Sequence, residues 1–167
     1  MKITDFENKI IQQLQGQITD LLVEGYPDEP ETFKLLHPKG ALLVRYLGSD
    51  FEDPEAGDFI SQERKMLFEV NVVARNLRQK YDPSPRAGAY EYLEAVRNAL
   101  TGFQPEGQRK LFPLHDSFVK EEEGIWIYAL RFVCPTFAVE LSEDETLPLA
   151  SQMTFNDETT GDITEVK

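Results

Sequence analysis

Residues 65–75 carry the most constraining pattern in this sequence, an alternation of two kinds of side chain along the whole segment. One set of alternate positions is wholly apolar, and the other mixes apolar, charged and amide side chains. The apolar set is Met66, Phe68, Val70, Val72 and Ala74, and the mixed set is Leu67, Glu69, Asn71, Val73 and Arg75. Because successive side chains of a strand point to opposite faces of a sheet, the pattern predicts a strand with one buried face.

Four further segments predict strands around it. Residues 125–134 place Trp126, Tyr128, Leu130, Phe132 and Cys134 on one apolar face, and residues 41–47 are short, apolar and rich in strand-forming side chains. Residues 110–119 also alternate, but Pro113 cannot donate to a neighbouring strand, so this segment is assigned to a sheet edge. The polar turn at 120–124 connects it to the 125–134 strand as a hairpin. Residues 21–26 are a possible short strand.

Two segments have the spacing of amphipathic helices. The first has apolar residues at intervals of three and four, and the second follows a Ser-Pro start and ends near a glycine. The first stripe is Ile3, Phe6, Ile10, Leu14 and Ile18; the second is Tyr90, Leu93, Val96, Leu100 and Phe103, with Ser84-Pro85 before it and Gly102 as the stop. Each helix needs an apolar surface to cover.

This order of elements predicts an α+β fold, a mostly antiparallel sheet of about four to five strands with two helices packed on one face. At 167 residues the chain fits one compact domain, which we place at residues 1–140. Residues 141–167 change to Ser, Glu, Asp and Thr with scattered apolar side chains, which predicts an acidic, flexible C-terminal tail in an isolated monomer.

The charge of the chain limits its partners. The formal net charge is −13, and the residues from Glu140 onward hold eight acids and one lysine. A surface of this sign argues against binding to nucleic acid phosphates, so we expect a protein partner. No apolar run approaches the length of a membrane span, and the first residues lack a secretion signal, so a cytoplasmic location without membrane contact is expected.

Few residues suggest catalysis or metal binding. His37 lies in a Pro-Gly turn, and His115 has only Asp116 beside it, which on a strand points to the opposite face. Cys134 is interpreted as a small core residue. The five acids of residues 48–58 lack the ligand spacing of a calcium loop. We therefore expect no catalytic site, metal or cofactor, and interpret 48–58 as a solvated loop that is long enough to bind a partner.

Polar side chains on strands indicate a face open to water or to another subunit, because burying them without partners is costly. Together with the acidic loop and the apolar side chains of the tail, they form the predicted interface with another subunit or with a tube. The residues are Arg45, Asp50, Glu52, Asp53, Glu55, Asp58, Glu69, Asn71, Arg75, Leu147, Leu149 and Phe155.

Several phrases of the sequence, taken together, resemble the tail-completion or tail-terminator family of Mu-like phages and prophages. They are YPDEPE at 26–31, HPKGALLVRY at 37–46, QER at 62–64, AYEYLEAVRNALTGF at 89–103 and EGIWIY at 123–128. The similarity spans roughly residues 3–140, and none of the phrases is a catalytic signature.

The resemblance implies a small α+β subunit that forms a homohexameric ring on the head-proximal end of a tail tube. Such a ring stops tube and sheath growth and presents a surface to the next component. Its partners would be further copies of itself, the tube protein, and a sheath or head-proximal connector protein. Similar cap proteins are expected in contractile injection systems, so the resemblance is compatible with a phage or with such a machine.

Two other classes of function stay open from the sequence. One is a monomeric adaptor or chaperone that binds tail components. The other is a small enzyme that uses His37 or His115, which a deep pocket around either histidine would support.

Overall fold

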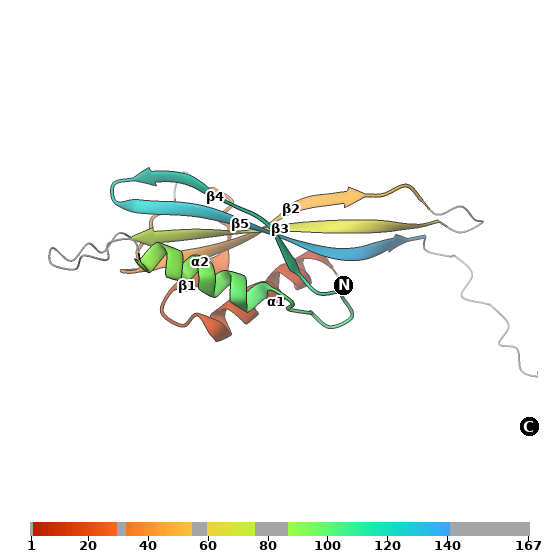
Figure 1. The fold of residues 1–167 in the computed structure, drawn as a ribbon, viewed down its shortest axis with the longest axis horizontal. Helices are drawn as coiled ribbons and strands as arrows, with labels where there is room; N and C mark the ends of the chain where they lie inside the picture. The colour runs from red at the N-terminus through yellow and green to blue at the C-terminus, as the bar shows by residue number, and fades with distance from the viewer. Residues whose placement is uncertain (1, 30–32, 55–59, 76–86, 141–167) are drawn as a thin grey trace, which may run out of the picture.

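The computed structural model describes residues 2–29, 33–54, 60–75 and 87–140. In chain order the elements are α1 (Ile3–Gln17), β1 (Leu22–Gly25), β2 (Gly40–Phe51), β3 (Ser61–Arg75), α2 (Ala87–Leu100), β4 (Phe112–Glu122) and β5 (Ile125–Val139). The strands form one sheet in the order β1-β2-β3-β5-β4. Only β1 and β2 pair in parallel; the other neighbours are antiparallel (Figure 1). The predicted α+β class and mostly antiparallel sheet are confirmed.

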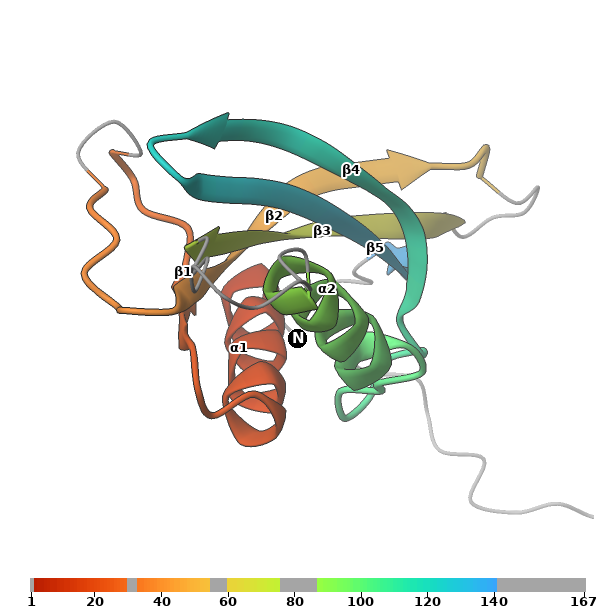
Figure 2. The same ribbon diagram turned by 60° about the vertical axis from the view of Figure 1, so that its left-hand side comes forward.

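Both helices cover one face of the sheet, which we call the inner face, and they lie side by side (Figure 2). The alternate positions of β3 that were expected to be buried do face them: Phe68, Val70 and Val72 are fully buried. From α1, the Phe6 ring stacks on the Phe68 ring with 4.7 Å between centroids. This aromatic contact joins the helix layer to the middle of the sheet.

The helix stripes agree with the sequence except at their ends. Phe6, Ile10 and Leu14 of α1 are buried, as are Leu93, Val96 and Leu100 of α2. Ile3 and Tyr90, in the first turns of the two helices, are instead exposed. Gly102 follows α2 with a φ of 79°, the left-handed conformation expected of a helix stop. The predicted start at Ser84-Pro85 lies outside the described residues.

Three strands are longer than predicted. The strand predicted at 65–75 begins at Ser61, and β5 continues to Val139 so that the two pair along their whole lengths. The segment 48–58 was expected to be a loop throughout, but Gly48–Phe51 continue β2 and pair with β3. In Figure 1 these strand ends extend beyond the helices. The prediction missed them because this part of the sheet has no helix layer and hence no simple apolar alternation.

The hairpin between β4 and β5 is tighter than predicted. Lys120–Glu122, assigned from sequence to the turn, belong to β4, and the turn consists of Glu123 and Gly124. Both have positive φ, 50° and 77°, which suits the twist of a two-residue hairpin and favours glycine at the second position. As predicted, the strand that contains Pro113 lies at a sheet edge.

The face away from the helices, which we call the outer face, is partly covered by the chain itself. Tyr26, Phe33 and Leu35, from the segment between β1 and β2, pack against Ala41, Leu43 and Val73. The expectation of a face open to water or to another subunit is therefore wrong at this end of the sheet. No helix of the described residues is long and apolar enough to cross a membrane.

Candidate functional site

Four polar side chains form a row across the middle of the outer face. Arg45 on β2 is opposite Glu69 on β3, Glu69 is opposite Arg131 on β5, and Arg131 is opposite His115 on β4. Residues directly opposite on neighbouring strands have side chains close enough to interact. The register alone therefore brings together polar side chains from four separate segments, and we call this set the cross-strand row.

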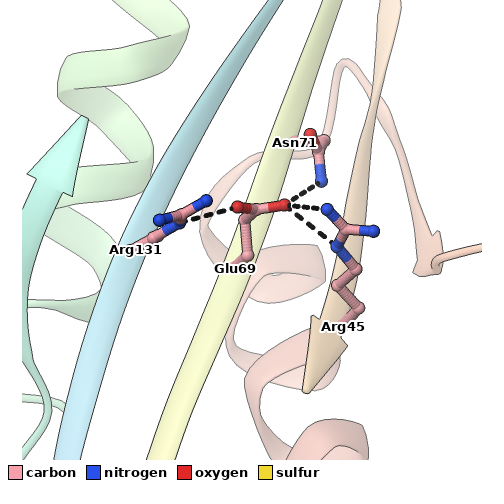
Figure 3. Close-up of polar contacts among 4 residues, drawn as sticks. All are labelled: Arg45, Glu69, Asn71 and Arg131. Atoms are coloured by element: carbon pink, nitrogen blue, oxygen red, sulfur yellow. Dashed lines mark hydrogen bonds and ion pairs between the residues drawn. The ribbon is translucent and has the colours of Figure 1, made fainter. Parts of the chain in front are cut away.

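Glu69 is the centre of the row, as Figure 3 shows. Its Oε1 accepts hydrogen bonds from Nε and Nη2 of Arg45 at 2.9 and 2.5 Å and from Nδ2 of Asn71 at 3.1 Å. Its Oε2 accepts a bond from Nε of Arg131 at 2.9 Å. Glu69 is only 1% exposed, so its charge is held in the sheet by these partners.

The pKa of Glu69 reflects two opposing effects. Burial raises the pKa, because it disfavours the charged form, but the hydrogen bonds from Arg131, Arg45 and Asn71 favour that form. The hydrogen bonds outweigh burial, and the pKa of Glu69 lies below its ordinary value. The carboxylate is therefore ionised at neutral pH.

For Glu69 and Asn71 this cluster corrects the expectation of a strand face open to water or to another subunit. Glu69 and Asn71 are buried and satisfied by intramolecular partners. Arg75, also assigned to the interface, is exposed and its Nη2 donates to the backbone oxygen of Leu35. Sequence reasoning missed Arg131, although it is the only charged residue in 125–134 and occupies the face opposite Trp126 and Tyr128.

A hollow of about 400 Å³ lies on the outer face next to the cross-strand row. Apolar side chains form most of its lining, including Tyr26, Phe33, Leu43, Val73 and Ile127, and Asn71 is part of the lining as well. Its charged members are Lys120, which is ion-paired to Glu122, and Glu123 at the β4–β5 turn, the end of the hollow away from the row. Asn71 also donates to Glu69, so it connects the hollow to the row. The Arg45 guanidinium lies 4.5 Å from the centroid of the Tyr26 ring. The outer face thus combines an apolar depression with two adjacent cations.

The free edge of the sheet is a second candidate surface. β4 is the last strand in the order, so one side of its backbone faces away from the sheet. Four large apolar side chains on it are between 44% and 55% exposed: Phe112, Leu114, Phe118 and Val119. A long edge strand with exposed apolar side chains is a template for pairing with another chain unless it is protected.

The predicted acidic interface is only partly within the described residues. Asp50 lies on β2 opposite Lys65, and Glu52 forms an ion pair with Lys65 just beyond the strand. Asp53 is exposed. The remaining members are outside the described residues: Glu55, Asp58, Leu147, Leu149 and Phe155. The predicted C-terminal tail at 141–167 lies outside them as well.

Comparison with known proteins gives a family. A family model described as "Gp37 protein" matches residues 10–157. The chain belongs to the Gp37 protein family. No similar sequence was found among curated proteins. A solved chain from the "Virion of native gene transfer agent (GTA) particle" is 17% identical over 77% of this chain and 92% of that chain, with a TM-score of 0.44.

In this Gp37-family chain neither histidine lies in a deep pocket of the described residues. His37 Nδ1 accepts from the backbone N–H groups of Lys39 and Gly40 at 3.4 Å, which closes the turn before β2. His115 is exposed on β4 and borders an open hollow of about 320 Å³. Asp116 pairs with Arg97 of α2 at 2.7 Å, on the face opposite His115, as the alternation predicts. Within the described residues, no group of three or more His, Cys, Asp or Glu side chains has a metal-binding arrangement.

Cys134 is a core residue of this Gp37-family chain, as predicted from its apolar surroundings. It is fully buried, and its thiol donates to the backbone oxygen of Arg109 at 3.2 Å. Burial raises the pKa of the thiol to about 11. The reactive thiolate is therefore scarce at neutral pH and inaccessible in the folded protein.

We expect the Cys134 thiol to be inert toward a disulfide reagent in the native protein at about pH 8 and to react fully once the chain is unfolded in denaturant. The measurement is the absorbance of the released thiol with and without denaturant. Rapid reaction of the native protein would place Cys134 at an accessible position and contradict the packing of β5 against the helices.

Proposed function

We propose that this chain is a structural component of a phage-like particle, and that copies of it form a ring that closes the end of a tail tube. Membership of the Gp37 family and the resemblance to tail terminators over roughly residues 3–140 support the proposal. Its partners in this role are further copies of itself, the tube protein, and a sheath or connector protein. The role is mechanical and needs no catalytic step.

The observation that carries the proposal is the exposed edge of β4. The strand has eleven residues, and apart from Ser117 all of them are exposed. The opposite end of the sheet offers a different edge. β1 pairs only with residues 41–44 of β2, so in the described residues the rest of β2 has β3 on one side and no strand on the other. Two unlike edges suit a head-to-tail contact, which closes into a ring when the rotation between subunits allows it.

Deleting the gene in a particle-producing strain tests the role directly. Without a terminating ring, tube rings continue to add, so tails seen by electron microscopy are expected to be longer than normal and variable in length. Restoring the gene on a plasmid should restore a single length. Uniform tails of normal length in the deletion strain would remove the proposal.

The edge contact is tested by a charge placed on β4. Leu114→Lys puts a cation at a 55% exposed position on the edge and should prevent neighbouring copies from associating. The matched control is Leu36→Lys, the same change at an 88% exposed position in the segment between β1 and β2. We expect variable tails with Leu114→Lys and uniform tails with Leu36→Lys. Uniform tails with both would exclude the β4 edge as the ring contact.

Purified particles separate this role from that of a monomeric adaptor. A terminating ring remains in the finished particle at one end of the tail, where antibody labelling detects it. An adaptor or chaperone leaves after assembly, so particles without the protein would favour that alternative. Light scattering of the purified protein gives the size of the species that forms before contact with a tube.

A further inference from the structure

The two arginines of the cross-strand row share one carboxylate. Arg45 and Arg131 both bond to Glu69, while their side chains remain 41% and 46% exposed. The three charges sum to +1 in a chain whose net charge is −13. Exposed guanidinium groups that flank a buried carboxylate offer donors to a further anion, and carboxylates are the partners that a guanidinium fork matches best.

The hollow defines what else such a partner must supply. Asn71, in its lining, is two residues from Glu69 along β3, so the hollow and the row are about 7 Å apart. An extended peptide with an apolar side chain and a carboxylate two residues later places both side chains on one face at the same separation. The outer face thus fits a short acidic segment with one apolar anchor.

Residues 141–167 of this chain contain such a segment. They hold seven acids and one lysine, and Phe155 is followed two residues later by Asp157 and then by Glu158. Their charge is opposite to that of the exposed arginines. The covalent connection keeps them at a high effective concentration near the sheet, which favours weak docking without a second molecule.

The length of the chain after β5 decides which acids of residues 141–167 can reach Arg131. Arg131 lies about eight residues back from Val139 along β5, which is roughly 27 Å. Glu145 is about five residues beyond Glu140, and a chain of that length spans at most about 18 Å. The acids at 143–145 therefore cannot reach Arg131. Asp157 is about seventeen residues beyond Glu140 and reaches this distance with ample slack.

We propose that residues 153–158 dock on the outer face of their own chain, with Phe155 in the hollow beside Asn71 and with the Asp157 carboxylate paired to the guanidinium groups of Arg45 and Arg131. This contact does not depend on the proposed ring. The docked segment covers the apolar hollow and gives each arginine a second carboxylate oxygen. Because the ion pairs are partly exposed, docking weakens as salt is raised.

Paramagnetic relaxation in NMR spectra tests the contact. A spin label is attached to Thr159→Cys under native conditions, where the buried Cys134 is protected from the reagent. The labelled, ¹⁵N-enriched chain is diluted into excess unlabelled wild type, so that any broadening arises within one molecule. We expect the amide signals of Leu43, Asn71 and Ala129 to lose most of their intensity, and Lys9 on the helix side to be unaffected.

Two charge variants of equal size decide which acids hold the segment. Asp157→Asn with Glu158→Gln should abolish the broadening, while the matched control, Asp162→Asn with Glu165→Gln, should leave it. The proposal is overturned by absence of broadening in the labelled wild type, by its persistence in the first variant or by its loss in the second. Broadening seen only when the spin label and the ¹⁵N label are on different molecules would also overturn it, since the segment then binds another copy.

Discussion

Replacing Arg45 and Arg131 together by methionine is expected to lower the free energy of unfolding by about 3–5 kcal/mol at neutral pH, because it leaves the buried Glu69 carboxylate without a cationic partner. Glu69 is 1% exposed and depends on three side chains for its hydrogen bonds, of which only Asn71 remains in the variant. Urea denaturation followed by circular dichroism measures the change.

The triple variant with Glu69→Met added is the matched control. Replacing a whole buried charge cluster by apolar side chains of similar volume is often neutral or stabilising. We therefore expect the triple variant to recover most of the stability that the double variant loses. A triple variant as unstable as the double would show that the arginine side chains contribute by packing rather than by their charge.

The contribution of Glu69 to the free energy of unfolding depends on pH in opposite directions in the wild type and in the double arginine variant. In the wild type the folded pKa of Glu69 is below its ordinary value of 4.5, so its contribution to stability is present above that pH and is lost as pH falls through the folded pKa. In the double arginine variant only burial and one amide bond act, which raises the folded pKa. The stability deficit is then largest at neutral pH and shrinks as pH falls through the raised pKa. A deficit that does not change with pH would contradict the electrostatic explanation.

The elements that form the helix-covered face of the sheet were predictable from the sequence, because each carries its own short-range pattern of apolar residues. The alternation in β3 and β5 and the helical spacing of Phe6, Ile10 and Leu14 each report burial on one face. The structure buries these positions apart from Trp126, which is partly buried. Pro113 also marks the edge strand, since a residue without an N–H group fits poorly in the middle of a sheet.

The outer face was less predictable, because the register between strands decides which of its side chains meet. Alternation assigns Glu69 to a face, but it does not say that Arg45 and Arg131 lie opposite it on the neighbouring strands. That pairing arises between segments separated by 24 and 62 positions in the sequence. The covering of the face by Tyr26 and its neighbours was missed for a similar reason, since a proline-rich segment has no periodic signal.

Phe68→Ala is expected to lower the free energy of unfolding by about 3–5 kcal/mol, because it opens a cavity where the helix layer meets the sheet. The Phe68 ring is fully buried, stacks on Phe6 and lies 5.4 Å from the Tyr46 ring in a tilted contact. The phenyl group is thus shared by α1, β2 and β3, and the strand backbones, which are held by hydrogen bonds to their neighbours, limit how far the cavity can close. Urea denaturation followed by circular dichroism gives the loss.

Phe137→Ala is the matched control, the same change on β5 at a position that is 44% exposed. Its ring is in contact with the Arg109 guanidinium, 4.7 Å from the ring centroid, and such an exposed cation–π contact contributes about 1 kcal/mol or less. We expect the Phe68 variant to lose several times more stability than the Phe137 variant, with similar dependence on urea concentration in both. Equal losses would mean that the sheet beyond the helices is as firmly packed as the core, and that Phe137 is buried by a contact between copies in solution.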